Sequence, residues 1–202
     1  MALLYRADLT PGKLDLIAGW LPGRPWYRGP GAPQPERVSA FRFDDPAGEV
    51  GVETILVRAE PDGPVFQIPL TYRGAPVPGA DAWLLGTSEH SVLGTRWIYD
   101  AAGDPVYAAV LAAAILTGGT EAAEEISTDE GLVSRTPAMS VRGTGTPGSD
   151  VPAVTAVAAV VDADPTVITT DSLTLALVRV LDGALPAGPA LLWGERALAA
   201  VV

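Results

Sequence analysis

Alternation of apolar and polar residues predicts a β-strand over residues 64–74. Residues 37–45 and 50–60 are two further strand candidates, and the short segments DPAGE and PDG separate the three. Turns this short connect antiparallel neighbours, so we expect a three-stranded meander. Pro69 has no N–H to donate, which places it on an edge strand or at an unpaired position. The apolar face of the third strand would carry Phe66, Ile68, Leu70 and Tyr72.

A first helix is predicted over residues 10–21, with Thr10 as its N-cap and Pro11 at its first position. Pro22 and Gly23 would end it. Its apolar positions recur at the spacing of one helical face. The face consists of Leu14, Ile17, Ala18 and Leu21.

A second helix is predicted after Asp104, which has the residue type and position of an N-cap, and before Gly118, which is typical of a helix stop. Pro105 fits the first helical position. A meander with one apolar face needs a cover, and this helix can supply it. The residues expected to face the sheet are Val106, Val110, Leu111 and Ile115.

The rest of the chain returns to β character after a polar segment. Residues 120–136 are acidic and are expected to form a loop, and β-branched runs recur within residues 137–202. We therefore divide the chain into an α+β region over residues 1–119, the acidic loop, and a β-rich extension that packs with the first region as one domain. The expected fold class is α+β, with a mainly antiparallel sheet. The predicted strands of the extension cover residues 153–163, 165–170, 172–183 and 190–196.

Composition narrows the classes of function. The 202-residue chain is 48% hydrophobic and 18% charged, its formal net charge is −11, and its single lysine is Lys13. The arginines are scattered, so we expect neither a nucleic-acid partner nor an anionic membrane surface. The absence of cysteine excludes disulfides and thiolate chemistry. The N-terminal residues lack a signal-peptide pattern, and the apolar run near residues 105–119 is too short to span a bilayer, so a cytoplasmic location is expected.

Candidate chemistry centres on the single histidine, His90, within the segment TSEHSVLGTRWIYD. One interpretation makes His90 a base that acts with Glu89 or Asp100. The other makes the segment a structural corner, in which His90 lies at a turn and RWIYD is a short strand. No phosphate-binding loop, nucleophile elbow or histidine metal cluster is present, and no cofactor is expected. Glu49 and Glu53 are expected on a solvated strand face.

A third interpretation is a saccharide site, because flat aromatic faces beside a few polar groups suit sugar binding. This signal is carried by residues from two neighbouring parts of the sequence. The ligand-binding candidates are Arg73, Trp83, Glu89, His90, Arg96, Trp97 and Tyr99.

Three motifs, in order, resemble one family. WLPGRPWYRG (20–29), VFQIPLTYRG (65–74) and LGTRWIYDAAGDPVYAAVLAAAI (93–115) are similar to the N-terminal cap of actinobacterial maltokinases and related sugar kinases. The resemblance covers residues of about 10 to 118 and implies a cystatin-like curved antiparallel sheet with a helix. The catalytic motifs of that family are missing, and no lysine follows Lys13, so no kinase catalytic residue can be carried over.

Two hypotheses follow from the residues and the resemblance. The first is a non-catalytic, cap-like accessory or regulatory protein of α-glucan, maltose or trehalose metabolism. It would dock to a sugar kinase or other glucan-pathway enzyme, or bind a saccharide. The alternative is a small carbohydrate-acting enzyme that uses His90 with Glu89 or Asp100. Self-association through an exposed sheet edge is a further possibility.

Overall fold

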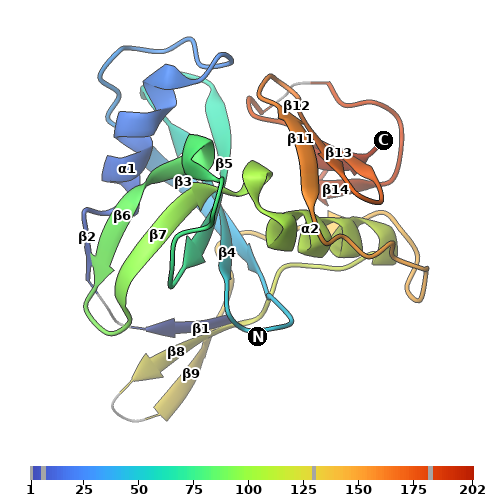
Figure 1. The fold of residues 1–202 in the computed structure, drawn as a ribbon, viewed down its shortest axis with the longest axis horizontal. Helices are drawn as coiled ribbons and strands as arrows, with labels where there is room; N and C mark the ends of the chain where they lie inside the picture. Colours follow the sequence, from blue (N-terminus) through green and yellow to red (C-terminus); the bar gives the residue numbers. More distant parts are fainter. Residues whose placement is uncertain (1, 6–7, 129–130, 182–183) are drawn as a thin grey trace.

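The computed structural model describes residues 2–5, 8–128, 131–181 and 184–202. Its centre is a curled, antiparallel, six-stranded sheet with the order β2-β6-β7-β5-β4-β3, here called the N-terminal sheet (Figure 1). The expected meander forms its β3-β4-β5 half. The strands are β2 (Leu9–Thr10), β3 (Glu36–Phe43), β4 (Gly51–Arg58), β5 (Val65–Arg73), β6 (Leu84–His90) and β7 (Gly94–Asp100).

Pro69 lies within β5, which is an internal strand, so the unpaired position is the correct alternative. The Gln67 N–H donates to Arg179 O at 2.8 Å, on the side of β5 away from β4. Backbone N–H groups alternate in direction along a strand, so the nitrogen of Pro69 points to that same side. The ladder with β7 begins at Leu70, and Pro69 therefore lies where β5 changes partners without losing a hydrogen bond.

Helix α1 (Lys13–Trp20) and the short 3₁₀ helix η1 (Leu21–Gly23) cover one face of the N-terminal sheet. The prediction of Thr10 as N-cap and Pro11 as first position is wrong. Thr10 pairs with Glu89 in the β2–β6 ladder, which leaves Gly12 as the cap residue. Asp15 Oδ2 accepts from the Gly12 N–H at 2.9 Å. The core under α1 also takes up the aromatic side chains Trp26 and Tyr27 of the following loop.

Helix α2 (Pro105–Thr117) begins and ends where the sequence predicts. Asp104 Oδ1 accepts from the Val106 N–H at 3.0 Å, and Gly118 ends the helix with φ of 70°. The inward side of α2 carries Tyr107, Leu111 and Ile115, all buried. They pack against the second face of the N-terminal sheet, through residues such as Phe41, Phe43, Val52 and Leu56.

A second six-stranded antiparallel sheet follows α2, with the order β10-β14-β15-β13-β12-β11, here called the C-terminal sheet. It packs on α2 and lies beside the N-terminal sheet, and one apolar cluster includes residues of both sheets and of α2 (Figure 1). The fold is α+β, as predicted. The strands are β10 (Arg142–Gly143), β11 (Val157–Val161), β12 (Thr166–Thr170), β13 (Thr174–Leu177), β14 (Ala190–Trp193) and β15 (Arg196–Val201).

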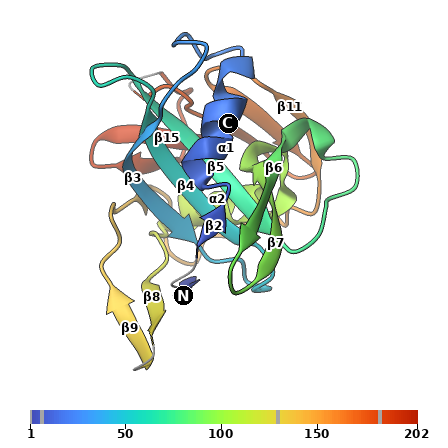
Figure 2. The ribbon, with the colours of Figure 1, turned by 90° about the vertical axis from the view of Figure 1, so that its left-hand side faces the viewer.

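A small third sheet joins the start of the chain to the segment after α2. Its order is β1-β8-β9, with β1 (Ala2–Tyr5) parallel to β8 (Glu124–Thr128) and β9 (Gly131–Arg135) antiparallel to β8. Figure 2 shows the β8–β9 hairpin extending away from the two large sheets. The prediction of a loop over residues 120–136 is therefore wrong for β8 and β9. Their acidic sequence gives no strand signal, and they form strands because β8 pairs with β1 and with β9.

Candidate functional site

His90 is the last residue of β6, immediately before the turn that leads into β7. His90 Nδ1 accepts from the backbone N–H groups of Val92 at 3.2 Å and Leu93 at 3.1 Å. Glu89 Oε1 accepts from the Thr95 hydroxyl at 2.7 Å, across the same hairpin. These bonds hold the turn, and they need a neutral imidazole because a protonated Nδ1 cannot accept.

The pKa of His90 lies below its ordinary value of 6.5. Burial is the largest cause, and the positive charges of Arg96 and Lys13 add to it. The lowered pKa keeps the imidazole neutral near pH 7. This is the form that serves the turn.

Asp100 lies at the opposite end of β7 from the histidine turn. His90 pairs with Gly94, and Asp100 is six residues further along, which is about 20 Å at about 3.3 Å per residue. Asp100 is fully buried and accepts from Arg179. Glu89 and His90 are consecutive residues of β6, so their side chains project to opposite faces of the sheet, and Asp100 is far from both.

Three of the proposed sugar-binding residues meet on one face of the N-terminal sheet. Arg73 is paired with Trp97, and Thr71 with Tyr99, in the β5–β7 ladder. Arg73 donates to both carboxylate oxygens of Asp104, at 2.8 and 2.7 Å, and this pairing raises the pKa of Arg73. The Tyr99 hydroxyl accepts from the Val77 N–H at 2.9 Å. Arg73 and Tyr99 are thus already bonded within the chain, whereas the buried Thr71 hydroxyl of the same face has no hydrogen-bond partner among the described residues.

The other two candidates also make internal contacts. The Trp83 indole lies against Gly103, where an added Cβ would come within 2.3 Å of Trp83 Cδ1. Arg96 Nη2 donates to Leu93 O at 2.6 Å, which ties the arginine to the histidine turn. Both residues consolidate local structure.

A buried charge cluster that sequence reasoning missed lies under the start of α1. Glu53 is 2% exposed, so the expectation of a solvated face is wrong for this residue, whereas Glu49 is exposed. Glu53 Oε2 accepts from Lys13 Nζ and from the Tyr72 hydroxyl at 2.7 Å, and it forms an ion pair with Arg42 Nη2 at 3.0 Å. The sequence did carry a signal for this cluster. Glu53 is the single carboxylate among the mainly apolar residues of β4, and it lies opposite Arg42 of β3.

The protonation states in this cluster follow from two cations around one carboxylate. Burial opposes ionisation of Glu53, but Arg42 and Lys13 together outweigh it and lower the pKa to about 2. Burial lowers the pKa of Lys13, against the attraction of Glu53. The pKa of Tyr72 is raised well above 10, because burial and the Glu53 charge both disfavour the phenolate. Tyr72 therefore stays protonated and donates its hydroxyl hydrogen to Glu53.

A second buried cluster joins the two large sheets. Arg179, fully buried, donates from Nη2 to Asp100 Oδ2 at 2.7 Å and from Nε to Thr166 Oγ1 at 2.8 Å. Its guanidinium lies 5.2 Å from the ring centroid of Trp26. Gln67 Nε2 donates to two carbonyls of the C-terminal part, Val178 at 2.8 Å and Leu198 at 3.0 Å. These contacts fix one sheet against the other.

A third contact between the sheets lies at the rim of this cluster. Asp162 accepts from the Trp26 indole N–H at 2.7 Å and from Arg24 Nη1 at 3.2 Å. The loop before β3, which contains Trp26, is thereby bonded to the turn between β11 and β12. All of these polar groups hold the fold together.

The glycine-rich segment GTGTPG packs on the end of α2. The Gly145 N–H donates to Ile115 O at 2.8 Å, and an added Cβ on Gly143 would come within 1.9 Å of Ala114 O. These glycines therefore serve a close backbone approach, in agreement with the exclusion of a phosphate loop.

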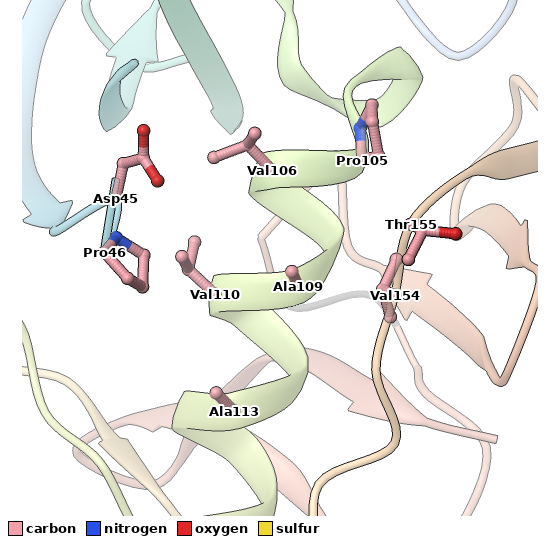
Figure 3. Close-up of a pocket in the computed structure, with 9 residues that line it drawn as sticks. All are labelled: Asp45, Pro46, Pro105, Val106, Ala109, Val110, Ala113, Val154 and Thr155. Atoms are coloured by element: carbon pink, nitrogen blue, oxygen red, sulfur yellow. The ribbon is translucent and has the colours of Figure 1, made fainter. Parts of the chain in front are cut away.

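An open apolar groove of about 250 Å³ runs along the outer side of α2. Figure 3 shows Val106 and Val110 pointing toward Asp45 and Pro46 on one side of the helix, with Val154 and Thr155 on the other side. The floor between these walls is made of Pro105, Ala109 and Ala113.

Both polar residues of the groove already make hydrogen bonds within the chain. Asp45 accepts from three backbone N–H groups of its own turn, those of Ala47, Glu49 and Val50. The Thr155 hydroxyl and N–H donate to Asp171. The groove thus offers mainly apolar contacts.

Within the described ranges, no group of three or more His, Asp or Glu side chains is arranged to hold a metal ion. Over the same part of the chain, no helix is long and apolar enough to cross a membrane.

Comparison with known proteins agrees with the resemblance. No curated protein matches the chain. The family model of the maltokinase N-terminal cap domain matches residues 20–104, which run from the end of α1 to the N-cap of α2. The matched region carries five strands of the N-terminal sheet, from β3 to β7, and no kinase catalytic domain is matched. This chain therefore contains a maltokinase N-terminal cap domain at residues 20–104.

Proposed function

We propose that this protein is a non-catalytic accessory or regulatory partner of a sugar kinase, and that it acts by docking rather than by turnover. The resemblance implies that caps of this type adjoin a kinase catalytic domain. In this chain the cap is followed by α2 and the C-terminal sheet. Both pack against it through buried polar and apolar contacts, so cap and extension would dock as one unit.

The observation that carries the proposal is that the polar side chains of the candidate site bond to other groups of this chain. Arg73 is held by Asp104, Tyr99 by Val77, and Asp100 by Arg179. A catalytic or sugar-binding site needs polar groups that converge on open space. Here those groups converge on each other, which favours a docking role over catalysis or saccharide binding.

The test is direct binding to a purified maltokinase, measured by size-exclusion chromatography with light scattering and by calorimetry. We expect a complex whose mass is the sum of the two proteins. A parallel thermal-shift series with maltose, trehalose and glucosamine should leave the melting temperature unchanged. A sugar at one hundred times its Kd would add about 2.7 kcal/mol of stability and would be visible. A sugar-dependent shift without kinase binding would overturn the docking proposal.

A further inference from the structure

Helix α2 has an unusual distribution of side chains for a helix that is only partly covered. None of its 13 residues is charged. A helix that is apolar on all sides is normally buried on all sides. The inward side of α2 is buried, but its outer stripe remains partly exposed to solvent. That stripe consists of Val106, Ala109, Ala113 and Leu116.

Three residues of the outer stripe, Val106, Ala109 and Ala113, line the groove described above, and the groove is small for a small-molecule site. Its volume of about 250 Å³ is below the range of about 300–1,000 Å³ that is usual for small-molecule sites. Ala109 and Ala113 are one helical turn apart, so their small side chains let large apolar side chains of another segment approach the α2 backbone. Pro46 and Val154 would flank such side chains.

Negative charge borders the groove on both sides. Asp45 lies in the wall formed by the β3–β4 turn, and Asp171 is bonded to Thr155 in the opposite wall. Hydrogen bonds from Thr155 lower the pKa of Asp171, which is therefore ionised at neutral pH. The nearby Arg73 is held by Asp104. The negative charges of Asp45 and Asp171 therefore favour an occupant with positive side chains beside its apolar ones.

We infer that this groove is the docking surface for a segment of a partner protein that presents large apolar side chains flanked by arginine or lysine. The inference rests on the proposed function and names the surface and the chemistry of the partner. A second copy of this chain is disfavoured as the occupant, because each copy carries a net charge of −11.

The groove is tested first with synthetic helical peptides, by fluorescence polarisation. One 14-residue peptide carries leucines on one face and arginines beside them, and its match carries glutamates in place of the arginines. The wild-type protein should bind the basic peptide at least tenfold more tightly than the acidic one. Ala113→Arg and Val154→Arg should each weaken that binding at least tenfold.

The matched control is Ala75→Arg, which adds the same charge at an exposed position after β5. It should change the affinity less than twofold. Val154 lies in a loop, so its variant keeps the test valid if an arginine within α2 disturbs folding. Equal binding by the wild-type protein and both groove variants, or equal binding of the two peptides, would overturn the inference.

The same variants separate this inference from the proposed function. If wild-type protein binds maltokinase and the groove variants bind it equally well, the groove is wrong while the docking function stands. A different result is that the wild-type protein does not bind maltokinase, while it binds the basic peptide and the groove variants do not. The surface is then right and the proposed kinase partner is wrong.

Discussion

Arg179 donates to Asp100 at 2.7 Å, and both side chains are fully buried between the two large sheets. The pair joins the last residue of β7 to the segment after β13. Arg179 Nη1 has no hydrogen-bond partner among the described residues. The bonds to Asp100 and Thr166 must therefore offset the free-energy cost of burying the guanidinium. A buried pair of this kind is costly to break from one side, because the remaining charge stays buried and unpaired.

Replacement of Asp100 by asparagine should therefore destabilise the protein by about 3–5 kcal/mol, which is typical of removing one partner of a buried pair. The measurement is urea unfolding at pH 7, followed by tryptophan fluorescence. Asp62→Asn, at an exposed turn, should shift the free energy of unfolding by less than about 0.5 kcal/mol. The double variant Asp100→Leu with Arg179→Met should recover much of the loss. An Asp100→Asn protein as stable as Asp62→Asn would contradict this account.

The second prediction concerns Glu53 and acid. Its pKa in the folded protein is about 2, against an ordinary value of 4.5, so folding favours the ionised form. At about 1.36 kcal/mol per unit, the difference is worth about 3 kcal/mol. This contribution is fully present above pH 4.5 and is lost as the pH falls from 4.5 through 2.

Glu53→Gln should therefore lower the free energy of unfolding at pH 7 by about 3 kcal/mol, and the gap to wild type should shrink below pH 4.5. Urea titrations at pH 7, 4.5 and 3 measure the gap. Glu49→Gln, on the exposed neighbouring turn, is the control and should give a small gap at each pH. A gap that is the same at pH 3 as at pH 7 would show that the Glu53 charge is not what stabilises the cluster.

Local signals in the sequence were enough for part of the fold. Helix α2 has an N-cap, a proline at its first position and a glycine stop, and the β3-β4-β5 meander has short turns, so both could be predicted. Strands β6, β10 and β15 could not. Residues 196–201 are rich in alanine, which is depleted in strands, and they pair because β13 and β14 flank them.

The buried clusters were out of reach for a related reason. Arg179 and Asp100 are 79 residues apart, and Lys13 and Glu53 are 40 apart, so no local pattern links them. What the sequence does contain is a charged residue inside each apolar run: Glu53 in β4 and Arg179 just after β13. Such a residue signals a buried pair without naming its partner. The only sequence signal for the groove is likewise the absence of charged residues from α2.

Asp104 has two structural tasks, and two substitutions separate them. It caps α2 through the Val106 N–H, and it binds Arg73 through both oxygens. Asparagine can still cap a helix but cannot form the ion pair, whereas alanine does neither. We expect thermal denaturation to rank the proteins as wild type, Asp104→Asn, Asp104→Ala, with about 1 kcal/mol between the two variants from the cap. Equal stability of both variants would exclude a capping contribution.

The single histidine allows an unambiguous titration of the β6–β7 turn. Because folding lowers the pKa of His90, it favours the neutral imidazole, whose Nδ1 accepts from the turn. The stability from this group is present above pH 6.5 and is lost as the pH falls through the folded-state pKa. The chemical shifts of the imidazole ring in an NMR titration should thus give a pKa below 6.5. Arg96→Gln should raise that pKa, because it removes a nearby positive charge, whereas Arg58→Gln, on the far end of β4, should leave it unchanged. A wild-type value at or above 6.5 would mean that the imidazole does not hold the turn in its neutral form, and would reopen the interpretations of His90 as a base or a ligand-binding residue.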